Sequence, residues 1–171
     1  VWTHHADEPR NETTMISSDT RAGIADLILR NAHFIDAGRL EEWAACFTGD
    51  GRYLVTTREN VDLGLEGVLM SCEGMPMLRD RVQYIRKAAV FNVHRDRHIV
   101  GQPLITAAED GSYNALTSFV LYQSEPDRDS RLFCLGVYED SIVLAGTDFR
   151  FRSRRVVLDN DTVTPLLSSP I

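Results

Sequence analysis

The feature that most constrains this chain is a change in its hydrophobic repeat near residue 98. Before this point apolar residues recur at helical spacing, and after it they alternate with polar residues in four long stretches. The stretches are HIVGQPLITAA (98–108), SYNALTSFVLYQSE (112–125), RLFCLGVYEDSIVLAG (131–146) and TDFRFRSRRVVLDN (147–160), separated by turn signals such as EDG and EPDRDS. Each is longer than the usual strand of about 5–6 residues. Helices followed by long strands predict an α+β fold, in which a strongly curved antiparallel sheet wraps the N-terminal helices into a cone with an interior pocket.

The N-terminal half has the spacing of amphipathic helices. The first is predicted in SDTRAGIADLILRNAHFIDAGRL, where Ser18 or Asp19 can cap the start and Gly38 suits a left-handed turn at the end. Two more are predicted in RLEEWAACF (39–47) and MPMLRDRVQYIRKAA (75–89). Between these helices, TGDG (48–51) predicts a turn and RYLVTT (52–57) a strand. Residues 58–74 have no clear pattern beyond a short strand in GVLMSCE.

Length and charge limit the classes of protein that need to be considered. With 171 residues, we expect one domain over residues 19–171, preceded by a polar N-terminal arm over residues 1–18. The net charge of −7 argues against a nucleic-acid or anionic-membrane partner. No apolar run approaches the ~20 residues that span a bilayer. Three cysteines distant in sequence do not suggest a disulfide framework, so we expect a cytoplasmic protein.

The densest cluster of ionisable groups is HRDRH, from His94 to His98. A metal site is disfavoured, because His94, Asp96 and His98 would stand in a row along one strand and converge poorly on one ion. Proton transfer is the second possibility, with the two histidines and Asp96, Asp36 or Tyr53 as carriers. The third is favoured: Arg95, Arg97 and the histidines form a structural or subunit-contact node of hydrogen bonds and ion pairs.

A second basic segment lies in FRFRSR, where Arg150, Arg152 and Arg154 occupy alternate positions. A strand would place these three side chains on one face of the sheet. That face is either a solvated outer surface or a contact with the acidic surface of a partner.

The order of these segments resembles the small (β) subunit of aromatic-ring-hydroxylating dioxygenases, which are Rieske non-haem iron oxygenases. The resemblance runs from Asp19 to the C-terminus and is carried by GRLEEWAACFTGDGRYLVTT, MLRDRVQYIRKA, RHIVGQPLI, ALTSFVLYQSE, FCLGVYEDSIV and FRSRRVVLDND. LRDRV followed by RHIVGQP is most similar to the β subunits that act on benzoate, terephthalate, salicylate or anthranilate. The resemblance implies the cone fold of nuclear transport factor and scytalone dehydratase.

The resemblance also implies the partners. The expected assembly is α3β3, in which a β trimer holds three catalytic α subunits that hydroxylate a carboxylated arene with O2. Electrons would come from NAD(P)H through a reductase or ferredoxin. A Rieske [2Fe–2S] cluster needs two cysteines and two histidines, yet no histidine lies within two residues after Cys46, Cys72 or Cys134. We therefore expect no catalytic residue, cofactor or metal on this chain, and expect the Rieske cluster and the mononuclear non-haem iron on the α subunit.

Two other functions are compatible with the same fold. One is a stand-alone isomerase or dehydratase in which His94, Asp96 and His98 carry protons. The other is a non-enzymatic module that binds a small ligand inside the cone.

Overall fold

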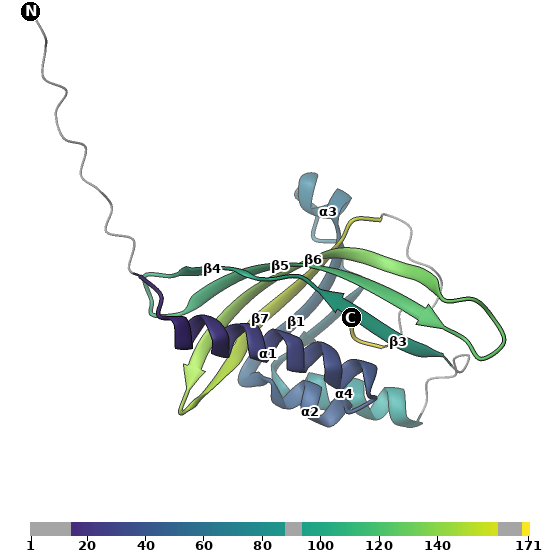
Figure 1. Cartoon of the computed structure of the whole chain (residues 1–171), viewed down its shortest axis with the longest axis horizontal. Helices are drawn as coiled ribbons and strands as arrows, with labels where there is room; N and C mark the ends of the chain where they lie inside the picture. Colours follow the sequence, from purple (N-terminus) through teal and green to yellow (C-terminus); the bar gives the residue numbers. More distant parts are fainter. Residues whose placement is uncertain (1–14, 88–93, 161–168) are drawn as a thin grey trace, which may run out of the picture.

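The structure is a computed structural model and describes residues 15–87, 94–160 and 169–171. Helices α1, α2 and α4 lie on the concave side of one curved sheet, whereas the short helix α3 lies on its convex side (Figure 1). The elements are α1 (Ser18–Asp36), α2 (Leu40–Ala45), β1 (Phe47–Thr57), α3 (Arg58–Asp62), β2 (Met70–Glu73), α4 (Gly74–Lys87), β3 (Arg95–Val100), β4 (Leu104–Ala107), β5 (Tyr113–Ser124), β6 (Arg131–Ala145) and β7 (Asp148–Leu158). The expected arm, residues 1–18, falls mostly outside the described residues.

The sheet confirms the predicted fold class, with one difference in strand direction. The strand order is β2-β1-β7-β6-β5-β3, and β4 also pairs with β5. All pairs are antiparallel except β1 and β7, which run parallel. Parallel neighbours need a long connection. Here the connection runs from the end of β1 to the start of β7 and includes every other strand of the sheet. An alternating pattern is common to both kinds of pair, so the sequence could not reveal this exception.

Two predicted segments are interrupted in the structure. The turn residues TGDG lie inside β1 and bulge out of it, because pairing with β7 breaks between Phe47 and Arg52. HIVGQPLITAA was predicted as one strand and forms two, β3 and β4. Pro103 stands in the gap and has no N–H to give to a ladder, while the N–H of Gly101 donates to Ser118 O at 2.8 Å.

Helix α1 supplies the face that closes the concave side. Its N-cap is Ser17, one residue before the predicted caps, and the Ser17 Oγ accepts a hydrogen bond from the N–H of Thr20 at 3.1 Å. The buried side chains follow the helical repeat and are Ile24, Leu27, Ile28, Asn31, Ala32 and Ile35. Gly38 adopts the predicted left-handed conformation, with φ of 67°.

Aromatic side chains fill the core beneath α2. The rings of Trp43, Phe47 and Tyr53 are fully buried and meet edge to face, with centroids 5.2–6.1 Å apart. The Tyr53 hydroxyl accepts from the N–H of Ile171 at 2.8 Å and donates to Ile171 O at 3.1 Å. Ile171 is thereby held against the core and is buried. Burial raises the pKa of the Tyr53 hydroxyl.

Candidate functional site

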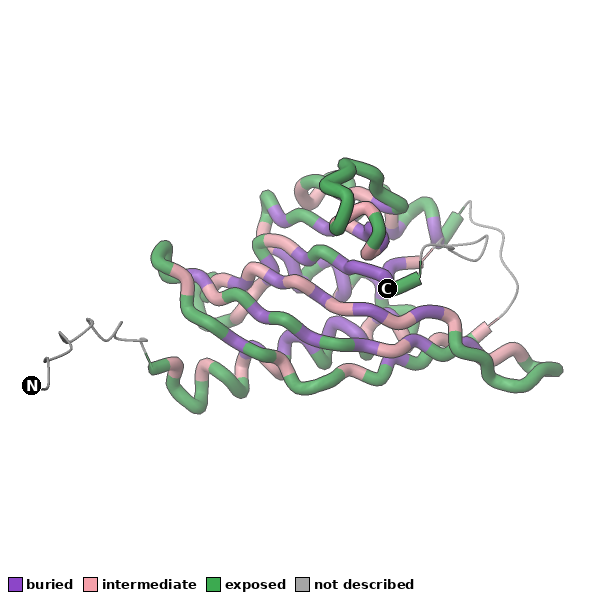
Figure 2. Tube along the Cα trace, turned by 90° about the horizontal axis from the view of Figure 1, so that it is seen from above, coloured by how far each residue is buried: buried purple, intermediate pink, exposed green. Residues whose placement is uncertain are grey.

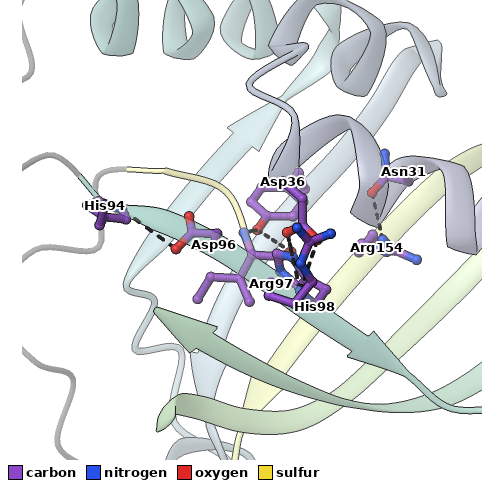
Figure 3. A network of polar contacts seen from close by, with 9 residues as sticks. Asn31, Asp36, His94, Asp96, Arg97, His98 and Arg154 are labelled. Atoms are coloured by element: carbon purple, nitrogen blue, oxygen red, sulfur yellow. Dashed lines mark hydrogen bonds and ion pairs between the residues drawn. The ribbon is translucent and has the colours of Figure 1, made fainter. Parts of the chain in front are cut away.

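His98 is fixed inside the concave side by Asp36, the last residue of α1 (Figure 3). The imidazole Nδ1 lies 2.6 Å from Asp36 Oδ1, and the main-chain N–H of His98 donates to both carboxylate oxygens at 3.1–3.2 Å. Because a carboxylate can only accept, Nδ1 carries the shared proton. The side chains are almost fully buried, with 0% of His98 and 5% of Asp36 exposed. One carboxylate therefore joins the end of α1 to β3 through three contacts.

The other residues of HRDRH separate into an inner and an outer set. His94 lies just before β3 and its Nε2 is 3.6 Å from Asp96 Oδ1, with both side chains largely buried. Arg95 and Arg97 alternate with these residues and are exposed. Arg97 Nη1 approaches Asp36 Oδ2 at 3.8 Å while 66% of the Arg97 side chain stays exposed. The structure thus pairs His98 with Asp36 and His94 with Asp96, instead of joining both histidines to one carboxylate.

Arg154 is the centre of a second buried polar network. Its guanidinium donates to both oxygens of Asp140 at 2.8 Å and to Asn31 Oδ1 at 2.7 Å. The same group lies 4.2 Å from the ring centres of Tyr138 and Phe151. Burial raises the pKa of the Asp140 carboxyl, and the guanidinium opposes that rise. Burial lowers the pKa of Arg154, but Asp140 outweighs this and the net shift is upward, so the arginine stays charged.

The three arginines of FRFRSR do not share one face, contrary to the prediction. Arg154 is buried, Arg152 is exposed, and Arg150 is intermediate. The cause is a bulge at Arg152: β6 pairs Ser141 with Ser153 and Ile142 with Phe151, leaving Arg152 as an extra residue. Arg152 instead binds Asp110 Oδ2 at 2.6 Å. Arg150 donates to Ala45 O at 3.2 Å, which ties β7 to α2.

The concave interior has the polar atoms of an acid–base site but little access to them. Among the described residues, five buried side-chain atoms have no hydrogen-bond partner: Trp43 Nε1, Asp96 Oδ1, His98 Nε2, Thr117 Oγ1 and Tyr138 Oη. Buried atoms of this kind commonly bind ordered water. The ring of Phe119 stacks on Tyr138 at 4.2 Å and lies 6.4 Å from the His98 ring, so aromatic side chains occupy the space between them. Four pockets lined by described residues include neither His98 nor Tyr138.

The cysteines are placed as single buried thiols. Cys46, Cys72 and Cys134 are free, and burial raises the pKa of each, to about 12 for Cys134. Within residues 15–87, 94–160 and 169–171, no group of three histidine, cysteine or acidic side chains is arranged to hold a metal ion. No helix in these ranges is long and apolar enough to cross a membrane.

The convex side has a second candidate site that the sequence interpretation missed. Helix α3 and the loop after it project from this side, and residues 62–69 are all exposed (Figure 2). Large apolar side chains are exposed in this loop and on β3, β4 and β5. On an ordinary protein surface such residues are scattered singly, whereas groups of them mark interaction sites. They are Leu63, Leu65, Val68 and Leu69 in the loop, and Ile99, Leu104, Leu116 and Tyr122 on the strands. The available signal was VDLGLEGVLM, an apolar stretch without a strand or helix repeat.

A curved sheet closed by helices, with a carboxylate–imidazole pair inside, defines a class of cone-shaped α+β domains. The model of the SnoaL-like domain family matches residues 17–155. Anthranilate 1,2-dioxygenase small subunit from Burkholderia cepacia is 32% identical over 158 residues, covering 91% of this chain and 98% of the relative. Subunit beta 2 of the terminal oxygenase component of terephthalate 1,2-dioxygenase from Comamonas sp. is 30% identical, over 82% of this chain and 91% of the relative.

A solved structure agrees with these relatives. It is the beta subunit of a protein described as an aromatic-ring-hydroxylating dioxygenase from Novosphingobium aromaticivorans. That subunit is 35% identical, has a TM-score of 0.81, and matches over 90% of this chain and 97% of its own. The chain therefore belongs to the SnoaL-like domain family and, within it, to the small (β) subunits of aromatic-ring-hydroxylating dioxygenases.

Proposed function

We propose that this chain is the β subunit of an oxygenase that hydroxylates a carboxylated arene with O2 and electrons derived from NAD(P)H. The observation that carries the proposal is the end-to-end match with the anthranilate dioxygenase small subunit, 98% of which is covered. The named substrates of the matched relatives, anthranilate and terephthalate, both carry carboxylate groups. The subunit would act as a scaffold in an α3β3 assembly. The Rieske cluster and the mononuclear iron would be on the α subunit.

The structure supports a scaffold role through its distribution of polar and apolar groups. The ionisable residues of the interior bind one another: Asp36 with His98, and Asp140 with Arg154. A group of large exposed apolar side chains, in the loop after α3 and on β3, β4 and β5, lies on the convex side. A scaffold subunit is expected to have buried ion pairs that hold its elements together and exposed apolar side chains that bind neighbouring subunits. Arg95, Arg97 and Arg152 remain proposed subunit contacts, since all three are exposed.

Co-purification tests this proposal directly. The chain is expressed alone and together with a candidate α subunit that carries paired Cys-x-His and Cys-x-x-His motifs. We expect iron, sulfide and arene hydroxylation in the co-expressed complex, and none of these in the chain alone. Iron at one equivalent, or turnover, in the lone purified chain would contradict the proposal.

The isomerase or dehydratase function is the second candidate, because Asp36 orients the His98 imidazole as a catalytic carboxylate would. This function requires His98→Ala to abolish turnover of a cyclic substrate by the lone chain. The scaffold function expects His98→Ala to lower the thermal midpoint while leaving the turnover number of the assembled oxygenase within about twofold of wild type.

A further inference from the structure

Two exposed apolar surfaces lie on the convex side at opposite edges of the sheet. The first, here the apolar knob, consists of Leu63, Leu65, Val68 and Leu69 in the loop between α3 and β2. The second, here the edge face, consists of Ile99, Leu104, Leu116 and Tyr122 on β3, β4 and β5. The strand order places β2 at one edge and β3 at the other. Figures 1 and 2 show α3 and β3 separated by the width of the sheet.

The knob is a fixed structure rather than a loose loop. Thr57 caps α3 by accepting the N–H of Asn60 on Oγ1 at 3.3 Å. The loop then folds back, and Gly67 O accepts hydrogen bonds from Thr56 Oγ1 at 2.7 Å and from Asn60 Nδ2 at 3.0 Å. With the backbone held in this way, Leu63 and Leu65 remain 64% and 57% exposed. A preorganised apolar projection loses little conformational entropy when it docks.

The two surfaces carry opposite charges. Asp62 and Glu66 are exposed on either side of the knob leucines. Arg95 and Arg97 are exposed on β3, beside Ile99 of the edge face. The edge face also borders a groove of about 620 Å³, which Leu104 and Leu116 line together with Glu139, Asp140 and Arg155. The convex side thus presents an acidic apolar projection at one edge and, at the other, an apolar surface with two exposed arginines on β3.

We propose that the apolar knob of one copy of this chain docks on the edge face of the next copy. Knob-to-knob contact is disfavoured because Asp62 and Glu66 would meet their own equivalents, whereas knob-to-edge contact pairs them with arginines. Contacts between two different surfaces are heterologous and build a ring when the rotation closes. That the ring contains three copies depends on the proposed function, in which β forms a trimer. The interface itself is inferred only from the apolar knob and the edge face.

The apolar part of the interface is tested by measuring the mass of the oligomers that the chain and its variants form. Native mass spectrometry and sedimentation velocity are recorded for the chain alone over a concentration series. Leu63→Ser with Leu65→Ser should weaken self-association about 100-fold, equivalent to about 2.8 kcal/mol. Leu29→Ser on α1 is the matched control, since Leu29 is 45% exposed but lies on the concave side. It should leave self-association unchanged. All variants should retain the thermal midpoint, because the replaced side chains are exposed.

The charged half is tested by reversal and rescue. Glu66→Arg and Arg95→Glu should each weaken association about tenfold, and the two together in one chain should restore most of it. Arg21→Glu on α1 is the control. A double variant as weak as the sum of its parts would overturn the proposed pairing of surfaces. A monomeric wild-type chain at every concentration, or a knob variant that associates like Leu29→Ser, would overturn the interface.

Co-purification with the iron-bearing subunit separates this inference from the proposed function. If that subunit co-purifies and the knob variant still forms trimers, the interface is wrong and the β-subunit function stands. If the wild-type chain self-associates through the knob but never binds an iron-bearing subunit, the interface stands and the proposed function is wrong.

Discussion

Replacing Arg154 by methionine should be among the most damaging single changes in this chain. The guanidinium has 0% of its surface exposed, as does the Asp140 carboxylate that it binds with two hydrogen bonds. Methionine would leave Asp140 charged and buried without a partner. Stranding one member of a buried ion pair costs roughly 3–5 kcal/mol. Loss of the Asn31 contact adds about 1 kcal/mol, so we expect about 4–6 kcal/mol.

A double variant distinguishes an isolated charge from a cavity. Asp140→Leu removes the second charge, and it should recover most of the loss when combined with Arg154→Met. Buried ion pairs replaced by apolar residues of similar volume are often neutral in stability. The double variant should therefore lie within about 2 kcal/mol of wild type, a coupling of at least about 3 kcal/mol between the sites.

The assay is urea unfolding followed by tryptophan fluorescence and circular dichroism, with the slope checked for constancy. The neighbouring pair Arg155–Glu139 provides the control, because 48% of the Arg155 side chain is exposed. Arg155→Met should cost less than about 1 kcal/mol. Additive effects in the Arg154 and Asp140 double variant would refute the reasoning, and so would equal losses at Arg154 and Arg155.

Three further outcomes follow from other contacts. Asp36→Ala leaves a buried main-chain N–H and the imidazole Nδ1–H without an acceptor and should cost about 1–3 kcal/mol in urea unfolding; Asp26→Ala, in an exposed pair on the same helix, should cost less than about 0.5 kcal/mol. Gly136→Ala places a Cβ 2.1 Å from a main-chain oxygen of β7 and should cost roughly 3 kcal/mol, whereas Gly49→Ala, with open space around it, should fold normally and a matching loss there would contradict the steric argument. A guanidinium on β7 holds the pKa of the Asp110 carboxyl well below its usual range, so its stabilisation is present above about pH 4 and is lost progressively as pH falls further. The difference in thermal midpoint between wild type and Asp110→Asn should therefore shrink steadily below about pH 4, and it should also shrink in high salt.

Repeats in the sequence predicted the elements well and the irregularities poorly. The helical spacing around Ile28 and the alternation over residues 112–160 correspond to α1, β5, β6 and β7. The bulge at Arg152 was not visible, because one extra residue shifts the phase of an alternating pattern without changing its composition. That shift takes Arg154 from the predicted outer face into the core. Helix α3 was missed because five residues are too few to establish a repeat.

The site residues show the same limit. HRDRH identified His98 as important, and Asp36 was one of three partners considered for it. Only the fold decides among these, because the end of α1 meets β3 across a separation of 62 residues. The pairing of Arg154 with Asp140 and Asn31 depends on three elements meeting and has no signature in the sequence. The leucines of the apolar knob are visible in the sequence, but the sequence does not reveal that they are exposed to solvent.

The Asp36–His98 pair has to be weighed against the scaffold function, because a carboxylate-bound imidazole is a common proton carrier. A catalytic imidazole needs its orienting carboxylate at one nitrogen and a substrate at the other. His98 meets the first requirement with Nδ1, but none of its side chain is exposed, so Nε2 is closed to a substrate in this arrangement. Tyr53, the alternative proton donor, already uses its hydroxyl to bind both main-chain groups of Ile171. His94 pairs with Asp96 instead of extending the relay. The residues that proton transfer would need are thus engaged in separate structural contacts. Two of these, Asp36–His98 and Tyr53–Ile171, link segments that are distant in the chain and rigidify the fold.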